Sequence, residues 1–193
     1  GHERAWIDCL AKTPRGVLMA ADHGDGDLPA PHGAKRVPVT PPLSLVNGLS
    51  LRAFNAAYYG KSWPAESRQH YLPYFYPLDA IHDWNRIYGK PGFYQYQCVV
   101  PPAAARDAIG EMLDAIASSG QGSFLAVLKN FGDRPTPGLL SFPMPGTTLA
   151  LDFPNHGAST LALFERLDAI VRAAGGRLYA AKDARMPGDF FRA

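Results

Sequence analysis

The sequence predicts an α+β domain in which helices cover one face of an antiparallel sheet. Three observations lead to this fold class. Residues 93–181 alternate strand-like and helix-like segments in the order β-α-β-β-α-β, the split motif of ferredoxin-like folds. Two of those segments carry apolar residues at helical spacing, and each is followed by glycine. The 193 residues include 18 Pro and 19 Gly, which indicates a large share of ordered loop.

Residues 1–92 form a loop-rich N-terminal part of the same domain. We expect a short helix over Arg4–Lys12, a strand over Gly16–Ala20 and a helix near Leu49–Tyr59. The prolines in Tyr71–Pro77 favour an extended conformation, because the residue before proline avoids the helical region. A helix should open at Pro77 and run through Tyr88 to Gly89.

The regular part spans residues 93–181. Its expected strands are Phe93–Val100, Ser123–Phe131, Thr147–Phe153 and Arg177–Ala181. One helix begins at Pro101-Pro102 and ends at Gly120, with Ile109, Met112, Leu113 and Ile116 on one face. A second helix is capped by Ser159, carries Leu163, Leu167, Ile170 and Val171, and ends at Gly175-Gly176.

Alternation along the strands separates an apolar face from a polar one. Leu149, Leu151 and Phe153 share one face of their strand, which the helices would cover. The opposite face then carries Gln95, Gln97, Lys129 and Thr148 in adjacent strands, together with Phe131. A polar sheet face can simply meet water. Large apolar groups mixed with amides and a lysine are also typical of a covered pocket for an oxygen-rich or anionic ligand.

Composition excludes several classes of function. The net charge of +2 and the absence of Lys/Arg clusters give no support for nucleic-acid binding. No apolar run approaches the roughly 20 residues that span a bilayer. Two cysteines, Cys9 and Cys98, are too few for a disulfide scaffold and are expected to be reduced. The acidic run Asp22–Asp27 lacks the spacing of a calcium loop, and the histidines show no zinc spacing, so no metal site is expected.

Seven short motifs occur in a defined order and together support a family resemblance. Each is weak alone, but their joint order and spacing are specific. They are Phe75–Asp79, Trp84–Arg86, Phe93–Gln97, Ser123–Gly132, Leu140–Gly146, Asp152–Pro154 and Gly175–Arg185. The chain resembles the C-terminal substrate (cap) domain of FAD-linked oxidoreductases of the vanillyl-alcohol oxidase/p-cresol methylhydroxylase superfamily. Within it, the chain is most similar to the decaprenylphosphoryl-β-D-ribose 2-oxidase type.

The resemblance implies a flavoenzyme whose FAD is bound mainly by a domain absent from this chain. It implies hydride transfer from a secondary alcohol of a sugar or polyol, either free, phosphorylated or lipid-linked, to FAD. Residues 182–193 would then start the return toward the FAD-binding domain. We expect the fragment alone to be inactive and the parent to be cytoplasmic.

The resemblance also assigns roles to individual residues. Lys182 matches a lysine beside the flavin and the reacting carbon, and Tyr179 matches a neighbouring flavin-side position. Lys182 and Lys129 are the implied catalytic residues. The implied substrate-binding residues are Gln95, Gln97, Lys129, Phe131, Thr148, Phe75 and Trp6.

The sequence departs from the mycobacterial-type enzymes at three pocket positions. Thr148 and Ala150 stand where those enzymes carry Asn and Cys, and Phe75 stands in place of a tyrosine. The pocket is therefore less polar and lacks a reactive thiol, which leaves another sugar or polyol open as substrate. A different class also stays open: a stand-alone ferredoxin-like module that binds a ligand or forms a homodimer without catalysis.

Overall fold

The main sheet has six strands in the order β2-β1-β6-β7-β5-β8, and neighbouring strands are antiparallel. The protein is described by a computed structural model over residues 2–31, 33–135, 137–138, 140–182 and 185–192. The strands are β1 (His2–Ile7), β2 (Gly16–Ala21), β5 (Phe93–Val100), β6 (Val127–Phe131), β7 (Gly146–Pro154) and β8 (Arg177–Leu178). The predicted α+β class is confirmed.

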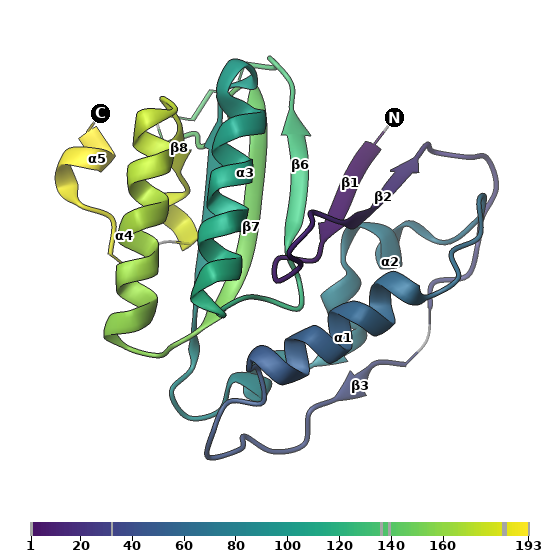
Figure 1. The fold of residues 1–193 in the computed structure, drawn as a ribbon. Coiled ribbons are helices and arrows are strands. Elements are labelled where there is room, and N and C mark those ends of the chain that lie inside the picture. The colour runs from purple at the N-terminus through teal and green to yellow at the C-terminus, as the bar shows by residue number, and fades with distance from the viewer. Residues whose placement is uncertain (1, 32, 136, 139, 183–184, 193) are drawn as a thin grey trace.

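Two long helices cover one face of this sheet (Figure 1). They are α3 (Pro102–Ser119) and α4 (Ala158–Ala173), as the apolar spacing predicts. The core between helices and sheet contains the fully buried Met112, Ile116, Leu149, Phe153, Phe164 and Leu167. Left-handed glycines follow both helices, Gly120 with φ 69° and Gly175 with φ 68°. Ser159 is not the cap of α4: it lies inside the helix, and Gly157 occupies the N-cap position.

The chain order β5-α3-β6-β7-α4-β8 agrees with the predicted β-α-β-β-α-β series. The sheet is wider than predicted, because β1 pairs with β6 and brings β2 with it. The finer assignment to a ferredoxin-like topology stays a prediction.

Three expected elements of the N-terminal part are wrong. Arg4–Lys12 is not a helix: its first residues belong to β1, because pairing on both sides with β2 and β6 outweighs local propensity. Tyr71–Pro77 is not extended, since α2 (Tyr71–Phe75) places Pro73 in the first turn, where a missing N–H costs nothing. Pro77–Tyr88 is not one helix, because Asp83 adopts a left-handed φ of 56°.

The remaining elements are short. The segment from Pro77 to Tyr88 contains two 3-10 helices, η1 (Pro77–Ala80) and η2 (Trp84–Tyr88), with β4 (Ile81–His82) between them. Strand β4 pairs in parallel with β3 (Lys35–Arg36). A third 3-10 helix, η3 (Ala180–Lys182), replaces the end of the last expected strand, and α5 (Gly188–Arg192) follows near the C-terminus.

Strand β6 is shorter than the expected Ser123–Phe131. The Ser123 hydroxyl bonds both the backbone N–H and the carbonyl of Leu125, which forms a local turn in place of strand pairing. The Cys9 thiol also donates to the Ser123 carbonyl at 3.5 Å. Both cysteines are buried free thiols.

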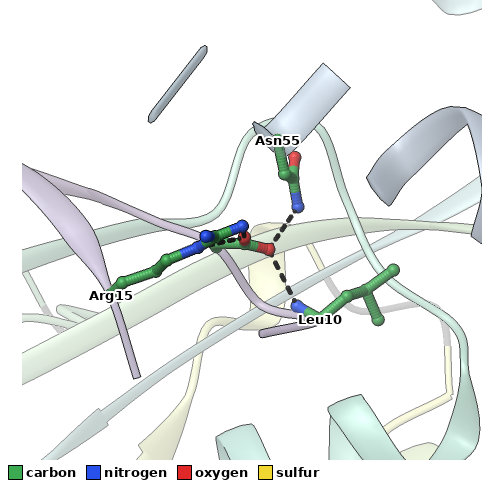
Figure 2. A network of polar contacts seen from close by, with 4 residues as sticks. Leu10, Arg15 and Asn55 are labelled. Atoms are coloured by element: carbon green, nitrogen blue, oxygen red, sulfur yellow. Dashed lines mark hydrogen bonds and ion pairs between the residues drawn. The ribbon is translucent and has the colours of Figure 1, made fainter. Parts of the chain in front are cut away.

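Helix α1 (Gly48–Gly60) is attached to the end of β1 by a buried polar network (Figure 2). The Asp8 carboxylate accepts hydrogen bonds from the Asn55 side chain at 2.7 Å and from the backbone N–H of Leu10 at 3.3 Å. Arg15 donates to the other carboxylate oxygen at 2.8 and 2.6 Å. Because Asp8 and Asn55 are both buried, this network fixes where α1 meets the sheet.

Candidate functional site

The sheet face opposite α3 and α4 carries the polar residues that the strand alternation predicts. In the β5–β7 register Gln95 lies opposite Asp152 and Gln97 lies opposite Ala150, while Lys129 lies opposite Thr148 between β6 and β7. Residues directly opposite in antiparallel strands share a face. We call this surface the polar face. Its strand residues include Arg4, Trp6, Gln95, Gln97, Lys129, Phe131, Thr148 and Asp152.

Two cross-strand hydrogen bonds fix the amides of the polar face. Gln95 Nε2 donates to Asp152 Oδ1 at 3.0 Å, and Gln97 Nε2 donates to Thr148 Oγ1 at 3.1 Å. Each bond uses one N–H of an amide that has two, and leaves the carbonyl oxygen for another partner. The face therefore holds two oriented amides with hydrogen-bonding capacity to spare.

Positive charge is concentrated beside these amides. The ammonium of Lys129 has its pKa lowered by partial burial and then by the positive charges of Arg4 and Lys182. Within the described residues, neither Lys129 nor Arg4 forms an ion pair with an acid. Burial likewise lowers the pKa of Arg4, whose Nε is buried without a hydrogen-bond partner. Such cations favour an anionic or electron-rich partner.

A pocket of about 230 Å³ opens at the β1–β6 side of the polar face. It brings together three of the predicted substrate-binding residues, Phe75, Lys129 and Phe131. The full lining is His2, Glu3, Arg4, Tyr74, Phe75, Lys129, Asn130 and Phe131. The Phe75 ring packs edge-on against His2 at 5.1 Å between centroids.

The flavin-side candidates lie at the β8 end of the sheet. The Tyr179 ring stacks on Phe142 at 4.7 Å between centroids, and Phe142 in turn contacts Phe131 at 6.0 Å. The backbone N–H of Tyr179 donates to the Gln97 carbonyl at 2.9 Å. Lys182 closes η3 and is exposed. Asp183 and Ala184 of the last quoted motif lie outside the described residues.

Two predicted substrate-binding residues are buried in this chain. Trp6 is 3% exposed, donates from Nε1 to the Phe124 carbonyl at 3.0 Å and packs against Tyr58. Thr148 is 2% exposed, with its hydroxyl held by Gln97. Their contact with substrate stays a prediction. In the structure the Thr148 hydroxyl is bonded to the Gln97 amide of the polar face.

Sequence reasoning missed Arg4 and Asp152 as site residues. Arg4 was hidden by the wrong helix over Arg4–Lys12, although alternation of Arg4 and Trp6 with Ala5 and Ile7 is the signal of a strand. Asp152 follows directly from the alternation of β7, where Leu151 and Phe153 point into the core. It is the only acid among the strand residues of the polar face.

Within the described ranges, no group of three or more His, Cys, Asp or Glu side chains could hold a metal ion. None of the helices formed by those same residues has the length and apolar character needed to cross a membrane.

Comparison with known proteins shows that the whole chain is similar to part of a known oxidase. Decaprenylphosphoryl-beta-D-ribose oxidase of Mycolicibacterium smegmatis is 36% identical over 207 residues, which cover 100% of this chain and 44% of that oxidase. This chain is a relative of part of that oxidase. The resemblance to FAD-linked oxidases is thereby confirmed.

A second relative covers less of the chain. The uncharacterized protein in the mprA 5' region of Streptomyces coelicolor is 36% identical over 109 residues, 56% of this chain and 28% of that protein. No protein-family model matches the chain. The chain thus spans less than half the length of either curated relative.

Proposed function

We propose that this chain forms the substrate-binding part of a flavin-dependent oxidoreductase. The parent protein would oxidise a secondary alcohol of a sugar or polyol by hydride transfer to FAD. The observation that carries the proposal is the polar face itself, where two fixed amides lie beside Arg4 and Lys129, neither of which forms an ion pair with an acid among the described residues. The similarity of the whole chain to part of decaprenylphosphoryl-beta-D-ribose oxidase supports the proposal.

The residues of the polar face fit a redox cofactor of this kind. A flavin, when bound, accepts a hydride and gains negative charge on its ring. Arg4, Lys129 and Lys182 bring positive charges to this side of the sheet, where Asp152 is the acid among the described strand residues and Glu3 lines the adjoining pocket. Lys182 and Tyr179 would hold the flavin side, and the ammonium of Lys182 would stabilise the developing charge.

The remaining side chains bind and orient the alcohol. Gln95 and Gln97 offer a carbonyl oxygen and an N–H each to neighbouring hydroxyls of a sugar, and the cross-strand bonds keep both amides in place before the ligand arrives. Lys129, Phe75 and Phe131 line the adjoining pocket. Its cation suits an electron-rich or anionic substituent, and its aromatic rings suit the apolar face of a sugar.

The substrate need not be the lipid-linked ribose named for the relative. Thr148 and Ala150 stand where the resemblance implies an amide and a thiol, so this pocket would accept a different pattern of hydroxyls. Free sugars, polyols and their phosphorylated or lipid-linked forms are the candidates.

The test begins with the native polypeptide. An antibody raised against this chain should detect a product far larger than 20.9 kDa in the source cells. The purified parent should show a flavin spectrum that bleaches anaerobically with one of three probes: decaprenylphosphoryl-β-D-ribose, D-ribose or xylitol. This chain alone should show neither property. A native product of this chain's own size would overturn the proposal in favour of a binding or dimerisation module.

A matched pair of variants tests the role of Lys182. Lys182→Met in the parent should slow flavin reduction while sugar binding persists. Lys90→Met, at an exposed lysine in the turn before β5, should leave the rate of reduction unchanged. Equal rates for the two variants would remove Lys182 from the proposed mechanism.

A further inference from the structure

Asp152 has a place on the polar face that suggests a chemical role. Its neighbours Leu151 and Phe153 are 2% and 0% exposed in the core, so the Asp152 side chain lies on the opposite surface of β7. There it faces Gln95 across the β5–β7 pair. The residue is 7% exposed, which is low for an aspartate.

Hydrogen bonds fix the position of Asp152, but no ion pair among the described residues offsets its negative charge. Gln95 donates to Oδ1 at 3.0 Å, and the backbone N–H of Asp152 donates to Ser123 Oγ at 3.3 Å. No cation lies within ion-pair distance of Asp152 among the described residues. A buried acid that served stability alone would normally be paired or hydrogen-bonded at both oxygens.

The titratable groups around Asp152 come from two other elements. Tyr88 of η2 is buried nearby and Lys182 of η3 approaches from the β8 side. Burial raises the pKa of Asp152, while the Gln95 hydrogen bond and the charge of Lys182 oppose the rise. A carboxylate with a raised pKa is a stronger base than an exposed one.

Oxidation of an alcohol requires such a base. The two amides of the face are not bases, whereas the carboxylate of Asp152 can accept a proton. If the proposed function holds, we propose that Asp152 accepts the hydroxyl proton of the substrate. The carbinol O–H bond would break with its proton passing to the Asp152 carboxylate, and the carbonyl bond would form as the carbinol C–H bond gives up its electron pair, as hydride, to the oxidised flavin that the parent would bind.

The decisive variant is Asp152→Asn in the parent protein. Asparagine keeps an oxygen to accept the Gln95 hydrogen bond, so the geometry of the amide is preserved while the base is lost. The rate of anaerobic flavin reduction by the probe that bleaches the wild type should fall by about 10²–10⁴-fold. The wild-type rate should rise with pH through the raised pKa of Asp152 and then level off, and the variant should lack that rise.

A control separates base chemistry from positioning. Gln95→Leu removes the donor but keeps the carboxylate, so it should raise KM and retain the pH-dependent rise. A readout independent of activity is the carboxyl ¹³C titration of Asp152 in the parent. It should show a pKa above that of ordinary aspartates, assigned by its disappearance in Asp152→Asn.

The outcomes are distinct. If the wild type is reduced by a probe and Asp152→Asn stays within about threefold of it with the same pH profile, this inference fails and the proposed function stands. An ordinary pKa for the Asp152 carboxyl also overturns the inference. If no probe reduces the flavin of the wild type, the proposed function fails and this inference fails with it.

Discussion

The guanidinium of Arg4 lies 4.5 Å from the centre of the Tyr74 ring. Tyr74 is itself fixed, because its hydroxyl lies 2.9 Å from the His2 carbonyl and 3.1 Å from the Met19 carbonyl, and donates to these strand groups. A residue of α2 thus supports a cation that β1 presents to the pocket. The loop-rich N-terminal part therefore contributes directly to the candidate site.

Two substitutions at Tyr74 should separate the hydroxyl from the ring. Tyr74→Phe should lower the free energy of unfolding by about 1 kcal/mol, since it loses the hydrogen bond and keeps the ring. Tyr74→Leu should cost about 0.5–1 kcal/mol more through the lost cation–π contact. Urea denaturation of the chain measures both values. Equal stability of the two variants would show that the ring contact with Arg4 contributes nothing.

Thr148→Val should release the Gln97 amide. The isosteric change removes a buried acceptor and should reduce stability by about 1 kcal/mol. In the parent it should raise KM more than it lowers kcat, since Gln97 is held in place only when Thr148 accepts its N–H. Thr148→Ser keeps the hydroxyl and should leave KM near the wild-type value. A Val variant with unchanged KM would contradict the positioning role.

The Asp8 network should respond unequally to loss of its two side-chain donors (Figure 2). Asn55 is fully buried, so Asn55→Ala should cost about 1–3 kcal/mol by leaving the Asp8 carboxylate short of a donor. The Arg15 side chain is 40% exposed, so water can replace it and Arg15→Gln should cost less. Urea denaturation of both variants checks the order, and the reverse order would contradict it.

The pKa of Lys129 should lie below the usual range for a lysine. Burial and the charges of Arg4 and Lys182 lower its pKa, which means that the folded chain releases this proton more readily than the unfolded chain. The contribution of Lys129 to stability should therefore rise as pH increases through its folded pKa. NMR of the ¹³C-methylated lysines measures the titration of Lys129. Arg4→Met should move the Lys129 titration upward, and no movement would exclude their coupling.

Both cysteines should resist thiol reagents in the folded chain. Burial raises the pKa of Cys9 to about 11 and that of Cys98 to about 12. Because the thiolate is the reacting form, modification near neutral pH should be slow and should accelerate on unfolding in guanidinium chloride. Time courses with a disulfide reagent measure both rates. Fast modification of the folded chain would contradict the buried placement.

The alternation of residues within single strands predicted the polar face of β5, β6 and β7, but not its extension onto β1. Alternation within single strands placed Gln95, Gln97 and Lys129 on one surface, since that information lies within a few residues. Strand β1 was missed because its pairing partner near Leu128 is far away in sequence, and Arg4 was missed with it. The burial of Thr148 depends on the Gln97 side chain in another strand, which the sequence of β7 alone does not reveal.

The cross-strand bonds of the polar face also constrain how its specificity can change over evolutionary time. The amide of Gln97 is fixed by Thr148, and that of Gln95 by Asp152. Replacing either glutamine by a residue without a donor would therefore leave a buried oxygen of its partner without this hydrogen bond. A change of preferred substrate should therefore arise through substitutions that keep each couple hydrogen-bonded. These are paired changes, one on β5 and one on β7, or single changes to a residue that still accepts the amide N–H, as Asn would in place of Thr148. Related sequences should preserve one donor and one acceptor in each couple.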